Sequence, residues 1–222
     1  QAGFSEAWIG DSQGIWKDPY VCLGACALQT TRIKLGIGVT NVRTRHLAVT
    51  ARAMATVDEL SGGRGLLGIG AGDTAFLHLD WKPATVATCR EAVHALRSLL
   101  AGDTATWQGG TIEPLQNLAC GPVPIYLAAS GPRMLELAGE VADGCIASAG
   151  LTPEYLCYVQ HHWGVGEKRR QTGRCEFVLQ TGGAIADDDA QAAREASTIV
   201  ARKMLQPVPR EVTKFDAQAS GE

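Results

Sequence analysis

Three short clusters of polar residues and glycines in this chain are of types that could do chemistry. They are Val39-Thr40-Asn41, Gly70-Ala71-Gly72-Asp73-Thr74 and Ser130-Gly131-Pro132-Arg133. Each cluster comes at the end of a short apolar run of the kind that forms a buried strand. Hydroxyl, carboxylate, amide and guanidinium groups can together hold a polar ligand by hydrogen bonds. The clusters therefore predict a binding site, provided that the fold brings them together.

The stretch from Ile33 to Gly72 indicates how the fold brings the first two clusters together. The apolar run Ile33–Val39 predicts a strand, His46–Leu60 has the spacing of a helix, and Arg64–Ile69 predicts a second strand. Two strands joined through a helix run parallel. In parallel α/β folds the ligand lies at the carboxyl ends of the strands. We therefore expect the Thr40 and Asp73 clusters to face one site.

The third cluster opens a predicted helix. A hydroxyl from Ser130, a flexible Gly131 and unpaired amides at a helix N-terminus suit a phosphate group. Pro132 is tolerated there because the first amide has no partner in a helix, and Arg133 adds positive charge. An alternative is that Ser130 simply caps the helix. The glycines of the second cluster also resemble a dinucleotide-binding fingerprint, but the spacing differs and no helix follows at once.

The remaining chain continues the alternation of strands and helices. We expect six strands, at Glu6–Gly10, Ile33–Val39, Arg64–Ile69, Pro122–Ala129, Cys145–Ala149 and Cys175–Gln180. We expect helices at Asp18–Thr31, His46–Leu60, Thr85–Leu100, Pro132–Asp143, Pro153–Arg170 and Ala190–Leu205. The turn-rich segment Gly102–Leu118 predicts an excursion or short hairpin. No linker divides the chain, so we expect one domain over residues 1–222.

Composition excludes several classes of protein. The chain has 222 residues, 45% of them hydrophobic, and a net charge of -3, which does not suggest a nucleic-acid surface. It contains neither an apolar run long enough to cross a membrane nor a signal-peptide pattern at its start. We therefore expect a cytoplasmic protein that binds neither membranes nor nucleic acids. Homo-oligomers are expected only if helices pair to cover apolar surface that the fold leaves open.

Seven scattered cysteines predict reduced, buried thiols rather than a disulfide framework. Cys22 and Cys26 lie one helical turn apart and could form half of a metal site. No second pair of Cys or His residues nearby completes four ligands, so we expect no metal.

The chain resembles the luciferase-like monooxygenase superfamily, and within it the deazaflavin (coenzyme F420)-dependent methylenetetrahydromethanopterin reductases and their relatives. Four segments carry the resemblance: Gly3–Asp11, Leu35–Asn41, Ala55–Asp73 and Pro122–Gly144. The resemblance implies a TIM (β/α)8 barrel. Family barrels have eight strands, and this chain supplies the second to the seventh. We therefore expect an incomplete barrel that lacks strands 1 and 8.

The resemblance also implies roles for individual residues. The peptide Gly38-Val39 is expected to form a cis bond in a bulge that backs the deazaflavin ring, with Thr40 and Asn41 offering hydrogen bonds. The other cofactor-binding residues are expected to be Gly70, Gly72, Asp73, Ser130, Gly131, Pro132 and Arg133. Asp11 is the catalytic candidate, although Ser12 stands where many relatives have a histidine. Position in the chain, independently of the resemblance, makes His78 and Trp81 in the loop after the strand Arg64–Ile69 candidates to line a substrate pocket, and His46 is expected to cap a helix near the site.

The implied function is hydride transfer between C5 of coenzyme F420 and a small organic substrate. One alternative is an FMN-dependent monooxygenase of the same superfamily, which activates oxygen. Another is a truncated barrel that binds a flavin without catalysis or serves as a scaffold. Binding of one cofactor, the other or neither separates the three.

Overall fold

The sheet of this protein has six parallel strands. The computed structural model describes residues 3–72, 74–77, 79–119, 121–148 and 152–204. The strands are β1 (Glu6–Ile9), β2 (Lys34–Asn41), β3 (Gly65–Gly70), β6 (Ile125–Ala129), β7 (Gly144–Ser148) and β8 (Glu176–Gln180), and they lie side by side in that order. Every neighbouring pair is parallel. The predicted order and direction of the strands are therefore confirmed.

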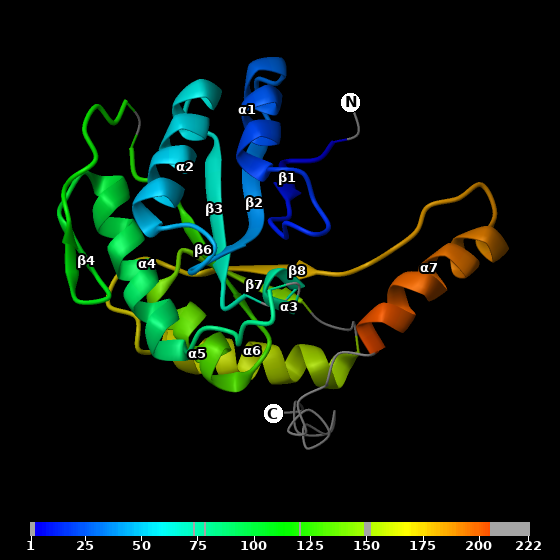
Figure 1. Ribbon diagram of the computed structural model, residues 1–222. Helices are drawn as coiled ribbons and strands as arrows, with labels where there is room; N and C mark the ends of the chain where they lie inside the picture. The colour runs from blue at the N-terminus through cyan, green and yellow to red at the C-terminus, as the bar shows by residue number, and fades with distance from the viewer. Residues whose placement is uncertain (1–2, 73, 78, 120, 149–151, 205–222) are drawn as a thin grey trace.

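Helices connect these strands. They are α1 (Pro19–Gln29), α2 (Leu47–Ser61), α3 (Thr74–Leu77), α4 (Val86–Ala101), α5 (Pro132–Val141), α6 (Pro153–Glu167) and α7 (Asp189–Met204). Figure 1 shows α1, α2, α4, α5 and α6 following one another around one side of a curled sheet, while α7 stands apart at the end of a long connection. The excursion after α4 is an antiparallel hairpin of β4 (Ala105–Trp107) and β5 (Gly110–Ile112). The short helix α3 was not predicted.

Local signals explain where the main helices begin and end. The Asp18 side chain accepts hydrogen bonds from the amides of Tyr20 and Val21 and so caps α1. His46 caps α2 by accepting from the Ala48 amide, as predicted. Gly62 ends α2 with a φ of 71°, a left-handed conformation that glycine adopts without steric cost.

The two faces of the sheet are packed differently, because side chains alternate along a strand. Residues such as Leu35, Leu67 and Leu127 point toward the helices and belong to the main hydrophobic core. Alternate positions on the other face form a smaller cluster, in which Leu66, Tyr126 and Ile146 are buried and Trp8, Val39 and Val178 pack against them. This second face is the concave, inner face of the curled sheet.

The sheet is a half-barrel rather than a closed barrel among the described residues. Its edge strands, β1 and β8, are both formed and are hydrogen-bonded to β2 and β7, respectively. The sheet is therefore continuous from β1 to β8. The family strands that the sequence was expected to lack, the first and the eighth, leave no gap between these six strands. What is confirmed is an incomplete α/β barrel of six parallel strands.

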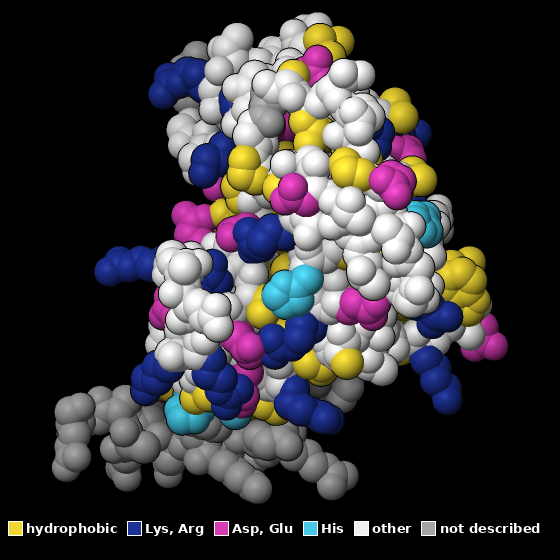
Figure 2. Space-filling view, turned by 90° about the vertical axis from the view of Figure 1, so that its left-hand side faces the viewer, with side chains coloured by type: hydrophobic (Ala, Val, Ile, Leu, Met, Phe, Trp, Pro, Cys, Tyr) yellow, Lys and Arg dark blue, Asp and Glu magenta, His cyan; other side chains and the backbone are white. Residues whose placement is uncertain are grey.

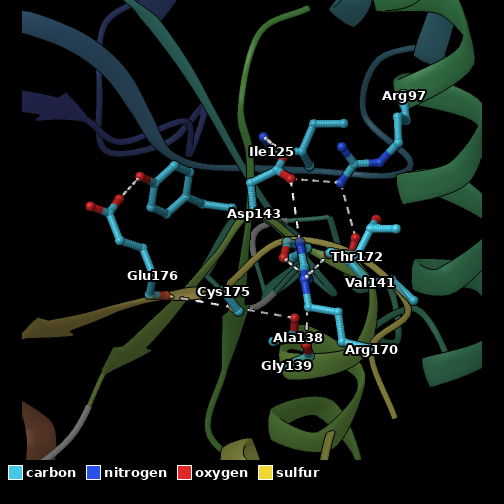
Figure 3. Close-up of polar contacts among 12 residues, drawn as sticks. Arg97, Ile125, Ala138, Gly139, Val141, Asp143, Arg170, Thr172, Cys175 and Glu176 are labelled. Atoms are coloured by element: carbon cyan, nitrogen blue, oxygen red, sulfur yellow. Dashed lines mark hydrogen bonds and ion pairs between the residues drawn. The ribbon is translucent and has the colours of Figure 1, made fainter. Parts of the chain in front are cut away.

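Arginine–carboxylate networks tie the amino-terminal ends of the strands together, opposite the predicted site. Figure 3 shows Asp143, at the start of β7, accepting a 2.8 Å hydrogen bond from the Ile125 amide and pairing with Arg97 at 3.1 Å and Arg170 at 3.7 Å. Arg170 also donates to main-chain oxygens of Gly139 and Ala142. Interactions at this end of a barrel stabilise the fold rather than perform chemistry.

The face of the molecule drawn in Figure 2 carries mixed charge. Figure 2 shows Lys and Arg side chains interspersed with Asp and Glu, and apolar groups in small patches between them. Within the described part of the chain, no helix is both long enough and apolar enough to span a bilayer.

Candidate active site

The end of β2 is irregular where the sequence predicts the site. Its register against β3 shifts between Ile37 and Thr40, and the Gly38-Val39 peptide between them is cis. The predicted bulge with a cis peptide is therefore confirmed as a feature of the backbone. The bulge turns the Val39 side chain onto the inner face of the sheet, where it joins the cluster around Leu66 and Tyr126.

Val39 occupies space that two glycines of β3 leave free. A Cβ atom on Gly68 would lie 2.9 Å from Cγ1 of Val39, and one on Gly70 would lie 3.2 Å from its Cγ2. The Gly70 position also lies 3.4 Å from the Cβ of Ala128 on β6. Val39, Gly70 and Ala128 thus meet across three neighbouring strands. The structure brings these predicted β2 and β3 residues together at the carboxyl edge of the sheet.

Asp11 is a buried carboxylate at the carboxyl end of β1, with 4% of its surface exposed. Its Oδ2 accepts a 2.7 Å hydrogen bond from the Thr40 hydroxyl and lies 3.7 Å from Nε of Arg45. Its Oδ1 accepts from the Gln13 amide at 3.1 Å. Because the Thr40 hydroxyl donates to Asp11, it faces a neighbouring strand and has only acceptor capacity left for a ligand.

The side chain of Asn41 makes hydrogen bonds within its own loop. Its Oδ1 accepts from the amides of Arg43 and Thr44, and its Nδ2 donates to the Thr44 hydroxyl at 2.9 Å. The side chain therefore closes the loop between β2 and α2, as asparagine commonly does in turns. The predicted hydrogen bond from Asn41 to the ring stays a prediction, and its amide is already in use.

The loop that Asn41 closes carries two arginines with different surroundings. Arg45 pairs with Asp18 at 2.6 Å and lies 5.0 Å from the centre of the Tyr20 ring. Burial is the largest single influence and lowers the pKa of Arg45, but the bond to Asp18 and the charges of Asp11 and Asp18 together outweigh it, so the net shift is upward. Arg43 instead stacks over Trp81 at 5.0 Å.

Tyr20 lies beneath this loop, where its hydroxyl is shielded from solvent. Burial, followed by the negative charge of Asp11, raises the pKa of Tyr20 to about 12. The phenol is therefore neutral at physiological pH.

A cleft of about 340 Å³ opens beside Asp11. Its lining residues are Gln13, Thr44, Arg45, Leu79 and Trp81. Trp81 was predicted to line a pocket and does so, whereas the other four lining residues were missed. The only sequence signal for them was the Arg43-Thr44-Arg45 triplet directly after a strand. The cleft lies at the carboxyl ends of the strands, where parallel α/β folds bind ligands.

The loop after β3 turns at Gly72, whose φ is 85°. A Cβ at Gly72 would overlap the ring of Phe76 in α3, so both the backbone angle and the packing favour glycine. Phe76 in turn meets Trp81 edge to face at 5.8 Å. The predicted residues Asp73 and His78 lie outside the described residues.

The fourth strand end, after β6, presents the N-terminus of α5. The N-cap is Gly131, and no side chain caps the helix, so the alternative of Ser130 as the N-cap is wrong. Ser130 and Arg133 are exposed. Pro132 has no N–H and the Met134 amide donates to the Gly131 carbonyl, so the groups left for an anion are the Arg133 amide, the Ser130 hydroxyl and the Arg133 guanidinium.

Sequence comparison decides which family these features belong to. A model of the luciferase-like monooxygenase family matches residues 1–222. The chain belongs to the luciferase-like monooxygenase family. Within it, 5,10-methylenetetrahydromethanopterin reductase of Methanolobus tindarius is 36% identical over 206 residues, covering 90% of this chain and 63% of that protein. An F420-dependent glucose-6-phosphate dehydrogenase of Beutenbergia cavernae is 36% identical over 172 residues, covering 68% of this chain and 50% of that protein.

Solved structures agree with this assignment. The coenzyme F420-dependent tetrahydromethanopterin reductase of Methanopyrus kandleri superposes with a TM-score of 0.83 at 28% identity, covering 97% of this chain and 69% of that one. An F420-dependent secondary alcohol dehydrogenase superposes at 0.75 with 18% identity, over 98% of this chain and 71% of that one, which shows a shared fold. The chain spans less than two thirds of the length of the curated relatives named above.

The part of the chain that the structure describes contains no candidate metal site. No group of three His, Cys, Asp or Glu residues there is placed to hold an ion. The six cysteines among those residues are free thiols.

Proposed function

We propose that this protein is a coenzyme F420-dependent oxidoreductase that exchanges a hydride with a small organic substrate. The observation that carries the proposal is the β2 bulge at Gly38-Val39, which stands at the carboxyl edge of the sheet beside the cleft. The family assignment and the relatives named for F420-dependent reactions support the choice of cofactor. When bound, the deazaflavin would supply the hydride chemistry at its C5.

The residues at the strand ends fit such a cofactor in two respects. Val39, Gly70 and Ala128 form a closely packed apolar surface against which a planar ring could lie. The uncapped N-terminus of α5, with Ser130, Gly131, Pro132 and Arg133, suits the phosphate of the cofactor's side chain. We propose Gly72 and Asp73 as further contacts to that side chain. The protein's part is to bind, orient and shield these groups.

Asp11 is the catalytic residue of this proposal. It is the buried carboxylate that the structure places at the carboxyl edge of the sheet, between β1 and the cleft residue Arg45. Thr40 and Gln13 hold its two oxygens in place. A carboxylate oriented by neighbours in this way can accept or return a proton at the substrate.

We also propose that the six strands of the parallel sheet (β1, β2, β3, β6, β7 and β8) occupy the second to seventh positions of an eight-stranded barrel, in one domain. The superposition on the Methanopyrus kandleri reductase supports this, because nearly all of this chain covers only 69% of that protein. The open inner face supports it too, since Trp8 and Val178 are only partly buried there.

Homo-oligomer formation through α1 and α2 is a further part of the proposal. Helix α1 has no charged residue, yet Val21 and Leu28 on its outer face are 73% and 69% exposed. On α2, Val49 and Leu60 are also exposed, at the spacing of one helical face. The uncharged outer face of α1 is complementary to itself, so a second copy of the chain is the partner that fits it. The free thiols favour a reducing, cytoplasmic location.

The test is a hydride-transfer assay with reduced and oxidised coenzyme F420. Substrates would be taken from the classes named for the relatives: methylenetetrahydromethanopterin, glucose 6-phosphate and a secondary alcohol. Turnover that changes the deazaflavin absorbance with one of them supports the proposal. Oxygen-dependent turnover with FMN instead would identify the monooxygenase alternative, and binding of neither cofactor would leave the scaffold alternative.

A further inference from the structure

The inner face of the sheet holds a connected set of aromatic and acidic side chains directly beneath the β2 bulge. We propose that Trp8 and Tyr126, fixed by Glu176, position the Gly38-Val39 bulge and thereby set where the cofactor ring lies. This inference rests on the proposed function. It gives a positioning role to Trp8, Tyr126 and Glu176, none of which was among the predicted site residues.

Trp8 is the residue in contact with the bulge. It pairs with Gly36 in the β1–β2 register. A Cβ on Gly36 would overlap the indole ring, and one on Gly38 would lie 3.0 Å from the Cβ of Trp8 and 3.3 Å from its Cε3. The indole thus lies flat over both glycines of β2. The backbone of Gly38 cannot shift toward the inner face without meeting this side chain.

Two contacts hold Trp8 in this orientation. Its indole nitrogen donates a 3.1 Å hydrogen bond to Oε2 of Glu6. The other carboxylate oxygen of Glu6, Oε1, pairs with Lys34 at 3.6 Å. The indole ring meets the ring of Tyr126 edge to face, with centroids 5.2 Å apart and an interplanar angle of 70°. Aromatic pairs in this geometry attract one another beyond the area they bury.

Tyr126 is fixed in turn by its own neighbours. Its ring covers Gly144 of β7, where a Cβ would overlap it. Its hydroxyl donates a hydrogen bond to the Glu176 carboxylate of β8. Because Tyr126, Gly144 and Glu176 stand in register on three adjacent strands, the contacts run from β8 to β1 and end at the bulge.

This arrangement gives the glycines of β2 and β7 a packing role. Gly36, Gly38 and Gly144 leave room for two large rings that would not fit over side chains. The rings of Trp8 and Tyr126 form a rigid layer under the bulge, which we call the floor. A rigid floor reduces the conformational entropy that the bulge loses when a ligand binds. The three supporting residues are positioning residues, since they act through the bulge rather than on the substrate.

The first experiment measures the dissociation constant for coenzyme F420 in four variants of the whole chain, below the melting temperature of each. Trp8→Leu and Tyr126→Leu are expected to weaken binding at least about tenfold, because the floor is lost. Trp8→Phe keeps a flat ring and is expected to stay within about threefold of the wild type. The matched control is Trp163→Leu, which removes a tryptophan packed against Phe177 at 5.6 Å in the main core.

The second experiment needs no cofactor. Hydrogen exchange of the amides in residues 37–41 is expected to be faster in Trp8→Leu than in Trp163→Leu, because only the former removes the floor. Equal exchange in the two variants would overturn the inference whatever the cofactor proves to be.

Binding results separate this inference from the function on which it rests. A wild type that binds coenzyme F420 while Trp8→Leu binds equally well overturns the positioning role alone. So does a Trp163→Leu variant that loses as much affinity as Trp8→Leu. A wild type that does not bind coenzyme F420 overturns the proposed function, and the cofactor part of this inference falls with it.

Discussion

The Thr40 hydroxyl donates a 2.7 Å hydrogen bond to the Asp11 carboxylate, joining the carboxyl ends of β2 and β1. The bond is buried, so breaking it would leave the Thr40 hydroxyl buried without this partner, which costs free energy. It links the candidate catalytic residue directly to the strand that carries the bulge. Asp11 follows the end of β1 in the chain, and this bond fixes it to β2, the strand that carries the bulge.

Substitution of Asp11 tests its catalytic role. Asp11→Asn keeps an acceptor for Thr40 but removes the charge, and we expect kcat to fall about a hundredfold, in line with loss of a general acid–base group. Asp18→Asn is the matched control, because Asp18 pairs with the same Arg45 but is more exposed. Steady-state kinetics of both variants make the comparison. Equal kcat values in Asp11→Asn and Asp18→Asn would contradict a catalytic role and leave Asp11 only as an ion-pair partner of Arg45.

The outer face of α1 predicts the state of association. Leu28→Glu places a charge on the uncharged face, and we expect it to shift the protein from oligomer to monomer, since a charge buried without a partner is costly. Ile185→Glu is the control, because Ile185 is 98% exposed on the connection after β8. Light scattering after size-exclusion chromatography gives the mass. A wild-type monomer, or an unchanged mass in Leu28→Glu, contradicts the proposed interface.

The crossing of α5 and α6 depends on one glycine of α6 and not on another. A Cβ on Gly166 would overlap the main-chain oxygen of Glu136, whereas nothing lies within 4 Å of a Cβ on Gly164. We expect Gly166→Ala to destabilise the protein by roughly 1–3 kcal/mol through overpacking. Gly164→Ala should stabilise it by roughly 0.5–1 kcal/mol, because alanine favours the helix. Urea denaturation measures both. A stabilising Gly166→Ala substitution is incompatible with the close crossing.

Alkaline pH should destabilise the fold through Tyr20. Its pKa is raised by burial to about 12 in the folded protein, from 10.0 in the reference state. The unfolded chain therefore releases this proton first, so the stabilisation is complete below pH 10 and is lost as the pH rises toward 12. Tyr20→Phe should flatten that part of the stability profile. Ultraviolet titration of the phenol follows the same group, and a Tyr20 that ionises near pH 10 would disprove the burial argument.

Much of the fold could be predicted because each signal was local. The apolar runs, Asp18 before α1 and Gly62 after α2 fixed where the elements lie, and the helical connections made the sheet parallel. The bulge at Gly38-Val39 was predicted from the family resemblance, and it is confirmed. These features depend on neighbours in the chain or on a motif that relatives share.

The side-chain roles could not be predicted as well, because they depend on register and on partners far away in sequence. Asn41 has the composition of a ligand-binding residue, yet its amide closes a loop with Thr44. The floor of Trp8 and Tyr126 requires contact between residues more than a hundred positions apart. The two residues share the inner face only because β1, β2, β3 and β6 keep a regular register on the amino-terminal side of the bulge.

Equilibrium titration of the purified 222-residue chain with coenzyme F420, and separately with FMN, tests the central claim most directly. The proposed site predicts saturable one-to-one binding of coenzyme F420, stronger than that of FMN, and weaker binding of the deazaflavin after Arg133→Ala, because the phosphate loses a cation. Absence of binding by both cofactors, or binding of FMN alone, would contradict the account.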